Sequence, residues 1–218
     1  RAELQAELPA PLAVRITEQR AKSIVVLASR EHHCLADLLV RNAYGELNAV
    51  VRAVVSNHDA LADLARRFDV PFHFISHEGL LREEHERRVL AAVEQYQPEF
   101  LVLAKYMRLL TGDFVSRFAQ RIVNIHHSFL PAFVGASPYR QAFQRGVKII
   151  GATAHFVTAE LDAGPIIAQG VVPVDHTHSA TDMAEAGRDV EKLVLAQALR
   201  LVLEDRVFVS GNRTIIFD

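Results

Sequence analysis

The segment RIVNIHHSFLPAF, residues 121–133, begins as a short apolar strand and runs directly into a loop that carries polar side chains. Asn124 and His126 are two residues apart, so in a strand both side chains point to the same face, whereas His127 starts on the opposite face. Open α/β sheets bind their ligands at the carboxyl ends of the strands. The segment therefore predicts an α/β sheet with a binding site at the end of this strand.

Apolar runs rich in β-branched residues alternate with amphipathic stretches before this segment, which is typical of parallel strands joined by crossover helices. This half of the chain predicts an open, mostly parallel, twisted sheet with helices on both faces. We expect strands at 23–29, 47–56, 72–76, 100–105 and 121–126, and helices at 33–43, 59–68 and 80–97. A short helix capped by Thr111 is expected between the last two strands.

The pattern changes in the second half of the chain. Elements are expected as a helix at 138–145, strands at 149–157 and 165–174, a long helix at 180–204 and a hairpin at 207–217. Ser179 and Asp182 have the spacing of a capping box for the long helix. The hairpin is indicated by two strand-like runs around a Gly-Asn turn, VFVSGNRTIIF. The fold class is thus α/β with a C-terminal β-hairpin.

Composition limits the classes of function. Of the 218 residues 50% are hydrophobic, enough for one large domain, which we place at 21–218 after a linker at 1–20 that contains Pro9 and Pro11. The net charge of −2 offers no basic surface for nucleic acid, and no apolar run approaches the length of about 20 residues that a membrane helix needs. The single cysteine, Cys34, is compatible with a reducing compartment, so we expect a cytoplasmic protein with a small-molecule partner.

Eleven histidines raise the hypothesis of a metal site. Adjacent histidines of a strand point to opposite faces, and neither an HExxH motif nor a cysteine cluster is present to complete a tetrahedral site. The loop SREHHCL, residues 29–35, lacks the glycines that let a backbone wrap a phosphate. We therefore expect neither a metal nor a nucleotide cofactor.

Asn124 and His126 suit a reaction in which a carbonyl carbon becomes tetrahedral, because an amide and a protonated imidazole can both donate to the developing oxyanion; one such donor contributes about 2.7–4 kcal/mol. A polar pair that only ends the strand fits the pattern equally well. Asp162, before Gly164-Pro165, can orient a water or tune a histidine, although Asp-x-Gly-Pro is also ordinary turn chemistry. His155 lies among apolar strand residues and is read as a hydrogen-bonded core histidine.

Several motifs in order resemble those of the folate-dependent formyltransferase family over about residues 22–205. They are Asn124-Ile125-His126, Ser128-x-Leu130-Pro131, His155-Phe156-Val157 and Leu161-Asp162-x-Gly164-Pro165-Ile166. The resemblance implies a Rossmann-like formyltransferase fold, with Asn124, His126 and Asp162 as the catalytic set. It also implies that LAKYMRLLT (103–111) is the folate-site loop. The implied substrate-binding residues are Arg108, Leu110, Ala159, Glu160, Leu161, His127 and His155.

Two features are similar to the members that hydrolyse 10-formyltetrahydrofolate rather than to those that formylate glycinamide ribonucleotide. SREHHCL stands where the ribonucleotide enzymes have a Gly-rich phosphate loop, and His127 stands where they have proline. The resemblance thus implies release of formate and tetrahydrofolate with water as nucleophile and without a cofactor, in one-carbon metabolism and purine biosynthesis. The alternatives are a formyltransferase with an amine acceptor, such as this ribonucleotide or an amino sugar, and a non-catalytic folate-binding module.

The resemblance also carries expectations for the whole protein. Hydrolases of this kind resemble two-domain proteins with an N-terminal ACT regulatory domain, which these residues lack, and RAEL at the start would then be the end of its last strand. A homo-oligomer is expected.

Overall fold

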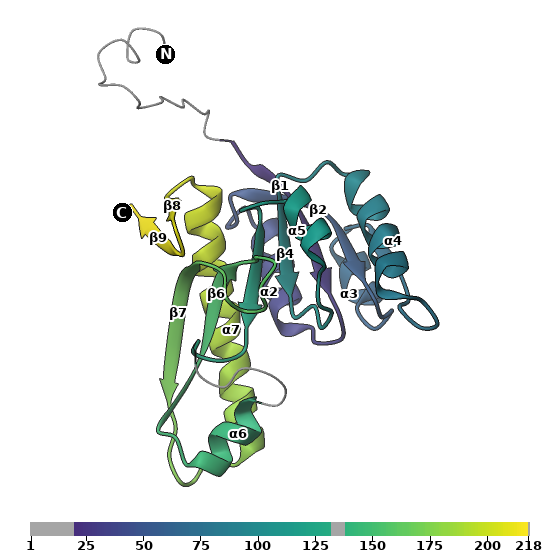
Figure 1. Ribbon diagram of the computed structural model, residues 1–218. Coiled ribbons are helices and arrows are strands. Elements are labelled where there is room, and N and C mark those ends of the chain that lie inside the picture. The colour runs from purple at the N-terminus through teal and green to yellow at the C-terminus, as the bar shows by residue number, and fades with distance from the viewer. Residues whose placement is uncertain (1–19, 132–137, 218) are drawn as a thin grey trace, which may run out of the picture.

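The computed structural model describes residues 20–131 and 138–217. The expected linker at 1–20 lies outside these residues except for Arg20. A seven-stranded sheet in the order β3-β2-β1-β4-β5-β6-β7 forms the centre of the fold, and β8 and β9 form a separate hairpin at the C-terminal end (Figure 1).

The first five strands are parallel, and the last two are antiparallel to their neighbours. The strands are β1 Lys22–Ala28, β2 Ala49–Ser56, β3 Phe72–Phe74, β4 Phe100–Ala104, β5 Ile122–His126, β6 Ile149–Phe156, β7 Ile166–Pro173, β8 Val207–Ser210 and β9 Arg213–Ile216. The helices are α2 His33–Ala43, α3 Ala62–Arg67, α4 Arg82–Glu94, α5 Gly112–Arg117, α6 Pro138–Arg145 and α7 Ala180–Leu203. This arrangement confirms the open, mostly parallel sheet and the C-terminal hairpin.

Helices cover both faces of the sheet, because alternate residues of each strand point to opposite sides. Val102 and Ala104 of β4 pack into the core that α2, α3 and α7 share. Leu101 and Leu103 of the same strand pack with α4 and α5. The two layers place the carboxyl ends of β1, β4 and β5 at one edge of the sheet, between the helices.

The long helix α7 crosses β6 and β7 and also contacts α2 and α6 (Figure 1). It begins with the expected capping box, in which the Ser179 hydroxyl accepts from the Asp182 N–H and the Asp182 carboxylate accepts from the Ser179 N–H. A Cβ at Gly187 would lie 2.1 Å from the hydroxyl oxygen of Tyr139 on α6. Glycine at this position therefore lets α6 approach α7 closely.

The C-terminal hairpin lies against the start of β7, where the Thr214 hydroxyl donates to the Ile166 carbonyl over 2.6 Å. Gly211 in its turn has φ +61°, a conformation that glycine adopts without strain. Within residues 20–131 and 138–217, no helix is long and apolar enough to cross a membrane.

Most expected elements are confirmed, and the bounds differ most at two helices, which are shorter than expected at both ends. The helix expected at 59–68 spans only Ala62–Arg67, and that expected at 80–97 ends at Glu94. Asp69 and Gln97 follow them with φ +55° and +44°, which lies outside the helical region.

We expect Ser179→Ala to lower the free energy of unfolding by about 1 kcal/mol, since it removes the hydroxyl that caps α7. Ser179→Thr keeps an acceptor at the same position and is the matched control. Urea denaturation followed by circular dichroism measures both. A Ser179→Ala variant as stable as the threonine variant would contradict the capping role.

Candidate active site

Two elements supply the three predicted catalytic residues. Asn124 and His126 lie on β5 and share a face, as the strand pattern predicts, and Asp162 lies in the loop between β6 and β7. Antiparallel pairing places Asn124 directly opposite His155 of β6. The loop after β6 leaves beside Ile122 and folds back toward His126, with Asp162 at φ +53°, a left-handed conformation that aspartate tolerates better than most residues.

The four polar side chains form a connected group. His126 Nδ1 lies 3.3 Å from Asp162 Oδ2, and His155 Nε2 lies 3.8 Å from Asp162 Oδ1. His155 Nδ1 lies 2.9 Å from the Phe156 carbonyl oxygen, which can only accept, so Nδ1 carries the proton. Its Nε2 therefore accepts a hydrogen bond from the Asn124 amide nitrogen, at 3.1 Å. His155 thus orients the amide of Asn124.

Burial and charge set the protonation of this group. Burial lowers the pKa of His155, so the ring is neutral at pH 7. The contact with His126 lowers the pKa of Asp162, which is therefore a carboxylate. A carboxylate only accepts, so His126 presents a protonated Nδ1 to Asp162.

The other nitrogen of His126 is the most informative atom of the group. Among the described residues, Nε2 has no hydrogen-bond partner although it is buried. Buried polar atoms are nearly always paired, so an unpaired one in a cavity wall indicates a partner supplied by a bound molecule.

Close packing fixes the loops around the group. A Cβ at Gly164 would lie 1.8 Å from the Phe156 carbonyl oxygen, so only glycine lets the Asp162 loop close onto β6. The buried Thr153 hydroxyl donates to the Ser128 carbonyl and accepts from the Leu130 N–H, at 2.9 and 3.0 Å. The segment after His127 is therefore held against β6.

All ten predicted site residues line one cavity of about 670 Å³, a size that suits a small-molecule ligand. Five further lining residues belong to the implied folate-site loop at 103–111: Leu103, Lys105, Tyr106, Met107 and Leu109. The structure adds four lining residues that the sequence analysis did not assign: Arg82, Ile125, Val157 and Thr158. Contact of any of these residues with a substrate remains a prediction.

The loop at 106–110, within the expected folate-site segment 103–111, is fixed at both ends. The Met107 N–H donates to the Ser29 hydroxyl over 2.9 Å, which ties the loop to the end of β1. The Glu86 carboxylate accepts from the N–H and the hydroxyl of Thr111. The main-chain groups of the loop are therefore held in place before any ligand binds.

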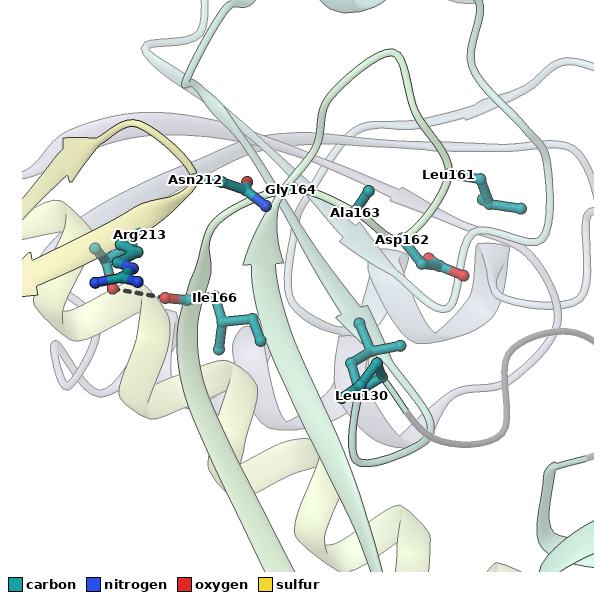
Figure 2. A pocket seen from close by; sticks show the side chains of 10 residues that line it. Leu130, Leu161, Asp162, Ala163, Gly164, Ile166, Asn212 and Arg213 are labelled. Atoms are coloured by element: carbon teal, nitrogen blue, oxygen red, sulfur yellow. Dashed lines mark hydrogen bonds between the residues drawn. The ribbon is translucent and has the colours of Figure 1, made fainter.

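A second cavity, of about 560 Å³, is lined by the Asp162 loop and by the C-terminal hairpin (Figure 2). Leu161 and Asp162 line both cavities. Asn212 and Arg213 of the C-terminal hairpin form part of its wall, as Figure 2 shows. Asp162 is thus exposed to two cavities.

A buried charged cluster beside the active site was not predicted from the sequence. Glu191 of α7 is fully buried, and its Oε2 lies 2.7 Å from His33 Nε2 and 3.2 Å from Lys105 Nζ. Tyr139 donates its hydroxyl to Oε1 over 2.6 Å. Burial alone would raise the pKa of Glu191, but the bond from His33 and the charge of Lys105 lower it to about 2, so the group is ionised.

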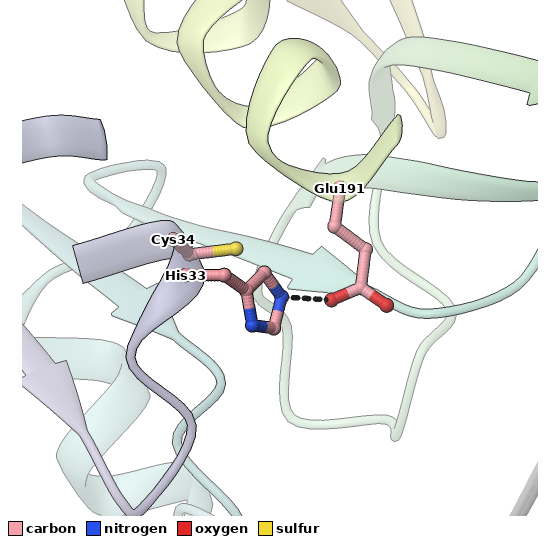
Figure 3. Close-up of side chains that lie close together, drawn as sticks. All are labelled: His33, Cys34 and Glu191. Atoms are coloured by element: carbon pink, nitrogen blue, oxygen red, sulfur yellow. Dashed lines mark hydrogen bonds and ion pairs between the residues drawn. The ribbon is translucent and has the colours of Figure 1, made fainter. Parts of the chain in front are cut away.

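His33, Cys34 and Glu191 lie close enough together to suggest a metal site, with their ligand atoms within 4.8 Å of one another (Figure 3). Two observations argue against that reading. Burial raises the pKa of the Cys34 thiol far above neutrality, so it is not the thiolate that metals prefer. The Lys105 ammonium already contacts the Glu191 oxygen, where it supplies the positive charge that a metal would bring.

Comparison with known proteins agrees with this geometry. The model of the formyl transferase family matches residues 22–199. The chain belongs to the formyl transferase family. It is 56% identical over 215 residues to a formyltetrahydrofolate deformylase of Escherichia coli, covering 99% of this chain and 77% of that protein.

Solved structures of the formyl transferase family include both hydrolases and transferases. A formyltetrahydrofolate deformylase from Pseudomonas syringae superposes with a TM-score of 0.89 and 49% identity, over 91% of this chain and 67% of that one. A glycinamide ribonucleotide transformylase from Symbiobacterium toebii superposes with a TM-score of 0.88 and 32% identity, over 96% of this chain and 100% of that one. The fold alone therefore does not separate the two activities.

We expect His127→Gln to reduce the loss of stability on acidification. Burial, together with the charge of Lys105, lowers the pKa of His127 to about 4. Between pH 6.5 and about 4, the unfolded chain binds a proton that the native chain does not. Stability is therefore lost as pH falls through this window, by on the order of 3 kcal/mol.

Denaturant titrations at pH 7 and pH 4.5 measure this effect. His176→Gln, at an exposed residue of the turn before α7, is the control. Equal acid sensitivity in the His127→Gln variant and the control would contradict the assignment.

Proposed function

We propose that this chain hydrolyses 10-formyltetrahydrofolate to formate and tetrahydrofolate. The observation that carries the proposal is the buried, unpaired His126 Nε2 in a cavity wall beside a carboxylate. Relatives support it: the proteins from Escherichia coli and Bacillus subtilis, at 56% and 47% identity, are formyltetrahydrofolate deformylases.

In the proposed reaction, water attacks the formyl carbon, the bond from that carbon to N10 breaks, and N10 leaves with a proton. Asp162 orients the water through Oδ1, and its Oδ2 pairs with His126. Protonated His126 donates through Nε2 to the oxyanion, and the Asn124 amide, which His155 orients, is the second donor. The proton that reaches N10 comes from this His, Asp and water group.

The pterin is proposed to occupy the cavity between the 106–110 and 157–162 loops. Main-chain groups near Arg108 and Leu110 and in the 159–162 loop would then hold its polar edge. Ala159, Glu160 and Leu161 line the same wall, which supports this placement.

The transferase alternative needs a site that positions an amine. In the SREHHCL loop, Arg30 and His32 are exposed, whereas His33 is buried and bonded to Glu191. None of these three side chains lines the 670 Å³ cavity. The hydrolase is favoured instead by the relatives, which are formyltetrahydrofolate deformylases.

Further expectations are part of the proposal. The catalytic groups are an amide, an imidazole and a carboxylate, which can act without a metal or an organic cofactor. We also propose that the protein is cytoplasmic and forms a homo-oligomer.

We expect the protein to release formate from 10-formyltetrahydrofolate with no amine present and with a chelator in excess. Formate and tetrahydrofolate should appear in equal amounts, as quantified by chromatography. Glycinamide ribonucleotide should neither speed turnover nor become formylated. If formylated ribonucleotide is the main product, the chain is a transferase; if added zinc or iron is needed to restore the rate, the cofactor assignment is wrong.

We expect Asp162→Asn and His126→Ala each to lower turnover by about a hundredfold or more, since each removes a water-orienting base or an oxyanion donor. Asp189→Asn, at an exposed carboxylate on α7 paired with Lys192, is the control for the aspartate change. Steady-state kinetics, with circular dichroism to check folding, measures the effect. A folded variant near the wild-type rate would remove that residue from the catalytic set.

A further inference from the structure

Lys105 has an unusual backbone for its environment. It follows β4 with φ +60°, in the left-handed region that favours glycine, yet its side chain is only 3% exposed. In regular strand geometry, residue 105 would point to the same face as Leu103, toward α4 and α5. Instead, its ammonium reaches Glu191 on α7, which covers the opposite face. The left-handed turn therefore redirects the side chain across the carboxyl edge of the sheet.

Three elements hold the lysine in this position. Glu191 on α7 contacts its ammonium at 3.2 Å, and His33 on α2 and Tyr139 on α6 fix the carboxylate from two further sides. Glu31 adds a longer contact of 3.8 Å. A buried ammonium is costly unless it is paired, and here the pairing is supplied by helices on one side of the sheet.

The position of Lys105 matters because this residue lines the same cavity as Asn124, His126 and Asp162. The loops at 106–110 and 157–162, with Asn124 and His126, form the wall on the α4 and α5 side. His127 points to the other face, with its ring 6.3 Å from that of Tyr139. Lys105 and His127 therefore form the part of the cavity wall that faces α2 and α7. A nucleophile larger than water needs room on the α2 and α7 side of the cavity, since the proposed folate site takes up the α4 and α5 side.

From this geometry, and resting on the proposed function, we infer that Lys105 is a specificity-determining residue that closes the α2 and α7 side of the active site to amines. Glu191, His33 and Tyr139 are its positioning residues. Water fits the remaining space, whereas a primary amine is displaced from attack on the formyl carbon.

Small displacements decide acyl transfer, because its rate depends steeply on the approach of the two reacting atoms. Shortening Lys105 would let an amine nitrogen bond to the formyl carbon, while the bond from that carbon to N10 breaks and a proton passes from the amine to N10. The products are then a formylated amine and tetrahydrofolate, and no other reactant is required.

The test measures how the formyl group of 10-formyltetrahydrofolate partitions between formate and N-formylglycinamide, with glycinamide as the added amine. We expect wild type to yield formate, and Lys105→Gly and Lys105→Asn to raise the N-formylglycinamide fraction by about tenfold or more. Glycine and asparagine both tolerate the left-handed backbone. Lys105→Met keeps the side-chain volume without the charge, so its product ratio should match wild type.

A ratio of two products does not depend on how much of the enzyme is active, so a merely structural loss does not move it. Combining each Lys105 substitution, Met included, with Glu191→Gln removes both buried charges, so the three variants are compared without a stranded carboxylate. An unchanged ratio in the shortened variants overturns the inference, as does an equal rise in Lys105→Met. Absence of formate from wild type without amine would instead contradict the proposed function.

Discussion

The antiparallel pairing of β6 with β5 is the constraint on which the active site depends. It places His155 opposite Asn124 and runs β6 back along β5 to Ile122, and the loop that follows folds back so that Asp162 reaches His126. A further parallel strand would have needed a crossover helix and would not have given the antiparallel register that sets His155 opposite Asn124. The change of strand direction thus assembles the catalytic group from two hydrogen-bonded neighbours.

Much of this site could be predicted from the sequence, because the signals for it lie in short segments of neighbouring residues. The two-residue spacing of Asn124 and His126 fixes their common face, and the turn signal around Gly164 places Asp162 in a tight loop. The role of His155 was underestimated. It is indeed a buried, hydrogen-bonded histidine, but its partner is the amide of Asn124, and only the strand register reveals that contact.

The cluster around Glu191 could not be predicted in the same way. Its members come from α2, α6, α7 and the end of β4, and no periodicity links them. The available signals were indirect: a lysine directly after an apolar strand, and an acidic residue on the apolar stripe of a long helix, near Val194 and Leu195. Either charge alone would read as a solvated side chain.

The closeness of Tyr139 to Gly187 has a consequence for the cooperativity of the whole domain. The tyrosine can reach Glu191 only when α6 lies directly on α7, and Lys105 can remain buried only when Glu191 is in place. Separating Lys105 from Glu191 strands a charge in the protein interior, which is far more costly than losing a neutral contact. Packing of the helices and the shape of the catalytic cavity are therefore coupled, and this edge of the protein gains or loses its order as one unit.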